Sequence, residues 1–209
     1  MAKTFYILLA VTLAAAAAFA GQKVVGARGT GIDEPFCAGC GTAYRVQVLV
    51  LKGQLGFAAP ITRLEYQSAA AASDVKFYKL ELRLCRTSRA VLTDDFAANY
   101  ENNTPALVAK ADPYNVNVKL DEWFGFDLSP PFNYDNSKNL IVEVRWQNEA
   151  TGAKANTWAY DTGVGRMLKT REYNGPKGTL VGTVNRFRVT YDNPAVDPSS
   201  LGRVKALYR

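Results

Sequence analysis

The chain has 209 residues, of which 25 are lysine or arginine, 19 are aspartate or glutamate, and none is histidine. The absence of histidine excludes a histidine-based catalytic triad, a histidine general base and the usual histidine-ligated zinc site. The formal net charge of +6 is spread among acidic residues, without a tract of lysine and arginine. We therefore expect a solvated surface and no nucleic-acid partner, because nucleic-acid binding needs a basic face.

The first twenty residues predict an export signal. Lys3 supplies a positive start, residues 5–19 are apolar, and Ala18-Phe19-Ala20 is a small-x-small cleavage sequence. The apolar run is short for a membrane span, which needs about 20 residues. We expect cleavage of residues 1–20 after Ala20. The remaining chain should be secreted, outside the cell or at its surface, and should have no membrane span. The alternative is a retained N-terminal helix buried in an assembly.

Residues 21–43 are rich in glycine and show no periodicity, which predicts an extended arm in front of the domain. A flexible terminus is one interpretation of this arm. In the other, the arm adds a strand to the sheet of a neighbouring subunit, and Val24, Val25 and Ile32 supply its apolar contacts.

From Tyr44 onward the chain predicts short strands separated by turns rich in Asn, Asp, Gly and Pro. The expected strands are 44–51, 61–66, 75–84, 105–110, 116–120, 123–128, 139–146, 156–160 and 183–191. No convincing helix follows the signal. We therefore expect an all-β fold, a single antiparallel β-sandwich of the jelly-roll kind over 44–191. Residues 192–209 form a tail that is a closing strand, a docking segment or a sorting tag.

The stretch 121–146 predicts the passage of the chain from one sheet to the other. Its second strand alternates apolar and polar residues, which places Glu143 and Arg145 on a wetter face. Pro130 and Pro131 cannot occupy a hydrogen-bonded central strand. We therefore expect the chain to leave the first sheet at these prolines and to enter the next at Asn139.

Several motifs occur in a recognisable order between residues 44 and 191. They are Arg45-x-Gln47, Gly56 with Ile61-Thr62-x-Leu64, Asn99-Tyr100-x-Asn102-x-Thr104-Pro105, Trp123-x-x-Phe126, Pro131-Phe132-x-Tyr134 and Asn139-Leu140-x-Val142-Glu143-Val144. Together they resemble secreted bacterial β-sandwich (jelly-roll-like) domains of cell-surface and extracellular proteins. The resemblance implies an exported surface or matrix component, and it supplies no catalytic residues.

The three cysteines are disulfide candidates. Cys37 and Cys40 form a CxxC motif, but Gly41 follows it, so the motif does not match haem attachment, and zinc would need a second ligand pair. In an exported protein a disulfide is the default. A link from Cys37 or Cys40 to Cys85 would tie the arm to the sandwich, and the third cysteine would be free or would pair between subunits.

Trp123, Trp146 and Trp158 raise the alternative of a sugar-stacking platform. The competing interpretation is that aromatic residues inside alternating strands belong to the core, because a buried ring removes a large apolar area from water. We expect no cofactor. Calcium, held by carboxylate oxygens in the loops, is the one metal left open, although no run of acidic residues has the spacing of an EF-hand.

These patterns lead to one principal expectation and one alternative. The principal one is a non-enzymatic structural subunit of an extracellular or cell-surface assembly, a filament of copies of this chain held by strand exchange through the terminal arm. The alternative is a carbohydrate-binding or adhesion module whose partners are surface glycans.

Overall fold

The computed structural model describes residues 20–37, 41–147 and 154–192. The expected signal segment up to residue 19, Cys40 and the tail from residue 193 lie outside this part of the chain. The described residues are almost entirely antiparallel β-strands, with one helix of four residues, α1 (Lys52–Leu55), and a single 3-10 turn (Ala98–Tyr100). The all-β sandwich expected from the sequence is confirmed.

The described residues form three sheets, and all the strand pairs in them are antiparallel. The four-stranded sheet has the order β1 (Ala20–Val25), β14 (Phe187–Asp192), β4 (Ala59–Gln67) and β8 (Trp123–Tyr134). The seven-stranded sheet has the order β12 (Thr179–Val181), β11 (Met167–Thr170), β3 (Ala43–Val50), β9 (Asn139–Gln147), β5 (Ala72–Thr87) and β6 (Ala106–Ala111), and β7 (Tyr114–Val118) also pairs with β5. A small sheet contains β13 (Thr183–Asn185), β10 (Thr157–Asp161) and β2 (Thr30–Ile32).

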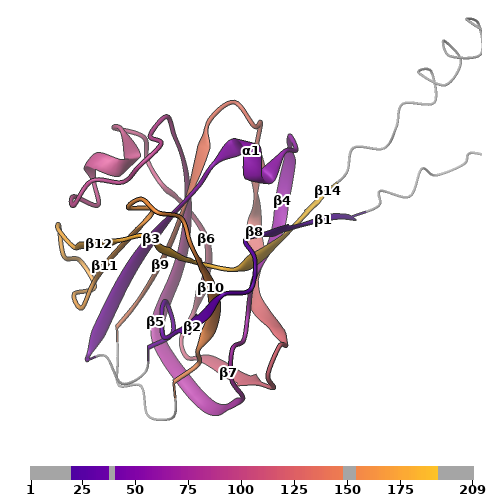
Figure 1. Cartoon of the computed structure of the whole chain (residues 1–209), viewed down its shortest axis with the longest axis vertical. Coiled ribbons are helices and arrows are strands. Elements are labelled where there is room, and N and C mark those ends of the chain that lie inside the picture. The colour runs from indigo at the N-terminus through magenta and orange to yellow at the C-terminus, as the bar shows by residue number, and fades with distance from the viewer. Residues whose placement is uncertain (1–19, 38–40, 148–153, 193–209) are drawn as a thin grey trace, which may run out of the picture.

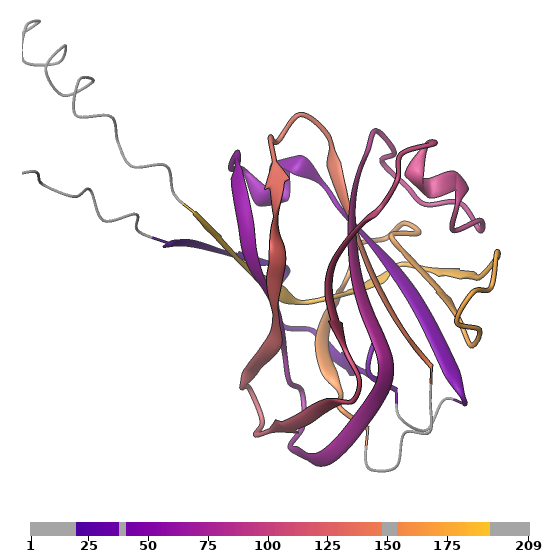
Figure 2. The ribbon, with the colours of Figure 1, turned by 180° about the vertical axis from the view of Figure 1, so that it is seen from behind.

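The two larger sheets face each other and enclose the core (Figures 1 and 2). In β5 the buried side chains Leu80, Leu82 and Leu84 alternate with the more exposed side chains between them. Leu64 in β4 and Phe126 in β8 are buried from the opposite sheet and belong to the same hydrophobic cluster. The period of two in the sequence therefore identifies the inward face of the central strands correctly.

The centre of the core is Phe36, which comes from the segment expected to be an arm. Its side chain is fully buried. Its ring centroid lies 5.1 to 6.3 Å from those of five rings contributed by both sheets, namely Tyr66, Phe77, Tyr114, Phe124 and Phe126. In addition, β1 and β2 pair with strands of the same chain. The expectation of an arm separate from the domain is therefore wrong for residues 21–37.

The chain does pass from one sheet to the other within 121–146, but not at the prolines. Strand β8 runs through Pro130 and Pro131 to Tyr134, and β9 then begins at Asn139 in the opposite sheet. Since β8 is the last strand of its sheet, its outer edge needs no backbone donors, and prolines are tolerated there. The prolines fall where the register with β4 is interrupted, between the pairs of Ile61 and Arg63.

Besides β1 and β2, two short strands were not expected, and one expected strand is divided. Strands β11 and β12 have four and three residues, too few to show a period in the sequence. The expected strand 183–191 is interrupted at Arg186, so β13 belongs to the small sheet and β14 to the four-stranded sheet.

Candidate functional site

The candidate site is the edge of the four-stranded sheet formed by β1. This strand pairs with β14 along its whole length, from Ala20 opposite Asp192 to Val25 opposite Phe187 (Figure 1). Among the described residues, no strand pairs with its other side. A strand in this position leaves one row of backbone donors and acceptors unpaired, and such an edge is a template for strand addition.

Few side chains hold β1 in place. Val25 is 2% exposed and packs into the core, whereas Val24 is 40% exposed. Ala20, Gln22 and Lys23 are exposed as well. The strand is therefore attached to β14 chiefly by the backbone ladder, because Val25 is the only buried residue among its six.

Ile32, the third residue expected to make arm contacts, lies in β2. It is half-buried, packs against the core and stands opposite Thr157 of β10. Val25 and Ile32 thus fill sites in their own chain, and Val24 points to solvent. A tight turn follows β1: Gly26 has φ +85°, and a Cβ at this position would come within 2.1 Å of the Tyr160 ring. Only glycine fits there, since both the left-handed backbone and the close ring exclude a side chain.

The cysteines do not make the expected link to the sandwich. Cys85 is a free thiol, 3% exposed, in a small hydrophobic cluster with Leu49, Phe96 and Ile141. Burial raises the pKa of the Cys85 thiol to about 11. A bond from Cys37 or Cys40 to Cys85 is therefore not formed. Cys37 is buried, and Cys40 lies outside the described residues.

The three tryptophans do not form a common platform. Trp146 is fully buried and stacks with Tyr44 at 5.9 Å between ring centroids, as the core interpretation expected. Trp123 and Trp158 are partly exposed, but arginine guanidiniums lie over both rings. The distances to the ring centroids are 4.8 Å for Arg188 and 5.2 Å for Arg186 over Trp123, and 5.9 Å for Arg28 over Trp158. The sugar-stacking alternative therefore loses Trp146, and arginines lie over its other two rings.

A buried polar network on the outer face of the seven-stranded sheet was missed. Glu143 is fully buried, and its Oε2 accepts hydrogen bonds from Arg45 Nε at 3.0 Å, Gln47 Nε2 at 2.9 Å and Tyr100 Oη at 2.6 Å. The loop 88–105 supplies Tyr100 and Phe96 and covers this face. The face of β9 that we expected to be solvated is therefore buried at Glu143. The signal in the sequence was a carboxylate between Val142 and Val144, which is consistent with either a solvated or a covered face.

Among the described residues, no group of three or more His, Cys, Asp or Glu side chains is arranged to hold a metal ion. No helix in this part of the chain has the length and apolar character needed to cross a membrane. No protein-family model, no curated protein and no solved structure matches the chain.

Proposed function

We propose that the chain is a non-enzymatic structural subunit of an extracellular or cell-surface assembly in which β1 of one copy takes the place of β1 in the next. The observation that carries this proposal is the pairing of β1: it is an edge strand, held by a six-residue ladder to β14, with Val25 as its only buried side chain. A strand of this kind can leave its own sheet with little loss of buried apolar area.

The contacts that β1 loses with its own β14 are formed again with β14 of the neighbouring copy. The same backbone hydrogen bonds to β14 and the same site for Val25 are available in every copy, so the exchanged and closed forms differ little in contact energy. The equilibrium between closed monomers and exchanged assemblies is then set by protein concentration, because association costs translational and rotational freedom. When the donor of each copy inserts into a different neighbour, the contact is head-to-tail, and repeated contacts of this type give a filament.

The segment between β1 and β2 would be the hinge. Residues 26–29 separate Val25 from Thr30, and four residues span at most about 14 Å when extended. Phe36 stays fixed in the core of the donor, so the exchanged unit is β1 alone. Short hinge loops favour exchange between copies, and this one has only four residues.

A reversible covalent lock tests the proposal. Gln22 and Thr190 are directly opposite each other on β1 and β14, outside the core. In the double variant Gln22→Cys with Thr190→Cys, oxidation of the monomer should join β1 to its own β14 and prevent assembly, and reduction should restore it. Oxidation after assembly should instead give a covalent ladder of multimers on a non-reducing gel, because the partner cysteine then belongs to the next copy.

The matched control uses Arg63→Cys with Asp127→Cys, an opposed pair on β4 and β8 that exchange does not separate. Its oxidation should leave assembly unchanged, as measured by light scattering and electron microscopy. If the locked Gln22→Cys, Thr190→Cys monomer assembles as well as its reduced form, strand exchange is wrong. If the unmodified chain stays monomeric at every concentration tested, the structural role is wrong as well.

A further inference from the structure

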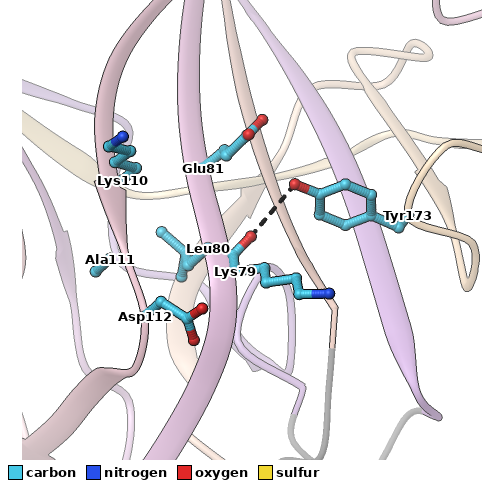
Figure 3. A pocket seen from close by; sticks show the side chains of 7 residues that line it. All are labelled: Lys79, Leu80, Glu81, Lys110, Ala111, Asp112 and Tyr173. Carbon is cyan, nitrogen blue, oxygen red and sulfur yellow. Dashed lines mark hydrogen bonds between the residues drawn. The ribbon is translucent and has the colours of Figure 1, made fainter.

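A pocket of about 460 Å³ lies on the outer face of the seven-stranded sheet, away from β1. It is formed by β5, by β6 with the residue after it, and by the loop between β11 and β12 (Figure 3). The lining residues are Lys79, Leu80, Glu81, Lys110, Ala111, Asp112 and Tyr173. Its volume is in the range of sites for small ligands.

An irregularity in β5 shapes the pocket. Lys79 has φ +46°, a left-handed backbone conformation that is uncommon for a residue with a side chain. At this point the register with β9 shifts between the pair Tyr78–Gln147 and the pair Glu81–Arg145. Bulges of this kind re-aim side chains and are frequent beside functional sites. Here the bulge places Lys79 and Leu80 at the pocket.

Tyr173 is held in a fixed orientation at one wall. The guanidinium of Arg145 lies 4.5 Å from the centroid of the Tyr173 ring, and the phenol donates a hydrogen bond of 3.4 Å to the backbone oxygen of Lys79. Arg145 is itself fixed by an ion pair of 2.6 Å with Glu81 and a hydrogen bond of 3.0 Å to Asn174 Oδ1. The aromatic ring is therefore positioned before any ligand arrives, which lowers the entropy cost of binding.

Two charged side chains at the pocket are available to a ligand. Within the described part of the chain, the Lys110 ammonium and the Asp112 carboxylate make no side-chain hydrogen bond or ion pair, in contrast to Glu81, which binds Arg83 and Arg145. Lys110 donates up to three hydrogen bonds and Asp112 accepts several. A free donor and a free acceptor thus stand on the same side of the fixed ring (Figure 3).

The charge balance of the lining indicates the ligand class. The two lysines and the two acidic residues cancel, so the pocket selects neither an anion such as a nucleic acid nor a cation. A neutral ligand with many hydroxyl groups uses both the ammonium and the carboxylate, and its C–H face packs on an aromatic ring. We propose that this pocket binds a saccharide, with Tyr173 as the stacking residue and Lys110 and Asp112 as the hydrogen-bonding residues.

Binding is tested with a printed array of plant, fungal, animal and bacterial glycans, followed by calorimetry on the best free oligosaccharide. The Tyr173→Ala variant should bind about tenfold more weakly or not at all, because a central aromatic contact contributes most of the affinity in such a site. Tyr173→Phe keeps the ring and should bind within about threefold of the unchanged chain. Lys110→Met and Asp112→Asn change exposed groups without touching the core, and each should weaken binding measurably.

Trp123→Ala is the matched control, since it removes a half-exposed ring on the opposite sheet and should leave the affinity unchanged. Absence of binding to every glycan on the array overturns the proposal. Binding that survives Tyr173→Ala but is lost in Trp123→Ala places the site elsewhere and also overturns it. Binding of a short peptide probe, such as trialanine, in place of any glycan would show that the ligand class is wrong. All these assays are repeated on the oxidised Gln22→Cys, Thr190→Cys chain, so binding is judged independently of assembly.

Discussion

The indole nitrogen of Trp146 donates a hydrogen bond of 2.8 Å to the backbone oxygen of Pro35. This bond joins the central strand β9 to the residue that precedes Phe36. The Trp146 ring also lies 5.1 Å from the Phe77 ring, which contacts Phe36 at 5.5 Å. The segment around Phe36 is therefore part of the sandwich core, whereas β1 contributes only Val25 to it.

We expect Phe36→Ala to lower the free energy of unfolding by about 3 to 5 kcal/mol, because it removes a fully buried ring from the middle of an aromatic cluster. Val24→Ala, the control in the same segment, changes an exposed side chain and should cost less than about 0.5 kcal/mol. Urea unfolding followed by tryptophan fluorescence measures both. Equal stability of Phe36→Ala and the unchanged chain would contradict the central place of this residue.

The inward faces of the long strands follow from the sequence, but the closure of the core does not. The alternation of apolar and polar residues in β5 identifies Leu80, Leu82 and Leu84 as inward-facing. This period can be read from the sequence because it depends only on residues of the same strand. Phe36 has no periodic neighbours, and its burial depends on strands far away along the chain. The burial of Glu143 likewise depends on the loop 88–105, which no local pattern places over β9.

The candidate sites also depend on contacts between residues that are distant in sequence, which local patterns do not predict. The sequence predicts Val24 and Val25 as contacts of a terminal segment, but the position of β1 at a sheet edge is defined by its pairing with β14, which is distant in sequence. Tyr173 and Lys110 come from separate strands and loops, so the pocket exists only after the sheet has formed.

We expect Glu143→Leu to lower the free energy of unfolding by about 3 to 5 kcal/mol, since it leaves the Arg45 guanidinium without its partner in a poorly solvated place. Tyr100→Phe removes one hydrogen bond to a charged acceptor and should cost about 1.5 to 3 kcal/mol. Hydrogen exchange should show faster opening of the loop 88–105 in both variants. Glu122→Gln, at an exposed carboxylate far from this network, is the control and should leave that exchange unchanged.

The Cys85 thiol should react slowly with a thiol reagent in the folded chain and rapidly in denaturant. It is buried, and its pKa of about 11 keeps the reactive thiolate scarce at neutral pH. A time course with Ellman's reagent measures the rate, and mass spectrometry of the unreduced, alkylated digest identifies the labelled cysteine. Recovery of Cys85 in a disulfide-linked peptide from native protein would contradict the free thiol.

Stability should be nearly constant from about pH 5 to pH 8 and should fall in acid. The chain has no histidine to titrate in the neutral range. Burial raises the pKa of Glu34, Glu65 and Glu81, but hydrogen bonds and charges from Lys169, from Arg188 with Arg63, and from Arg145 with Arg83 outweigh it, so each folded pKa lies below the ordinary 4.5. A carboxylate with a lowered folded pKa contributes stability above its unfolded value, and this contribution is lost as the pH falls through the folded value.

Urea midpoints measured between about pH 3 and pH 8 should therefore drop below about pH 4.5. Glu65→Gln should lower the urea midpoint at neutral pH. It should also make the midpoint fall less steeply in acid, because the neutral amide has no proton to gain. Asp74→Asn, at an exposed position without an ion pair in the described structure, is the control and should leave the slope unchanged. A midpoint that stays the same from neutral pH down to about pH 3 would show that these ion pairs contribute nothing to folding.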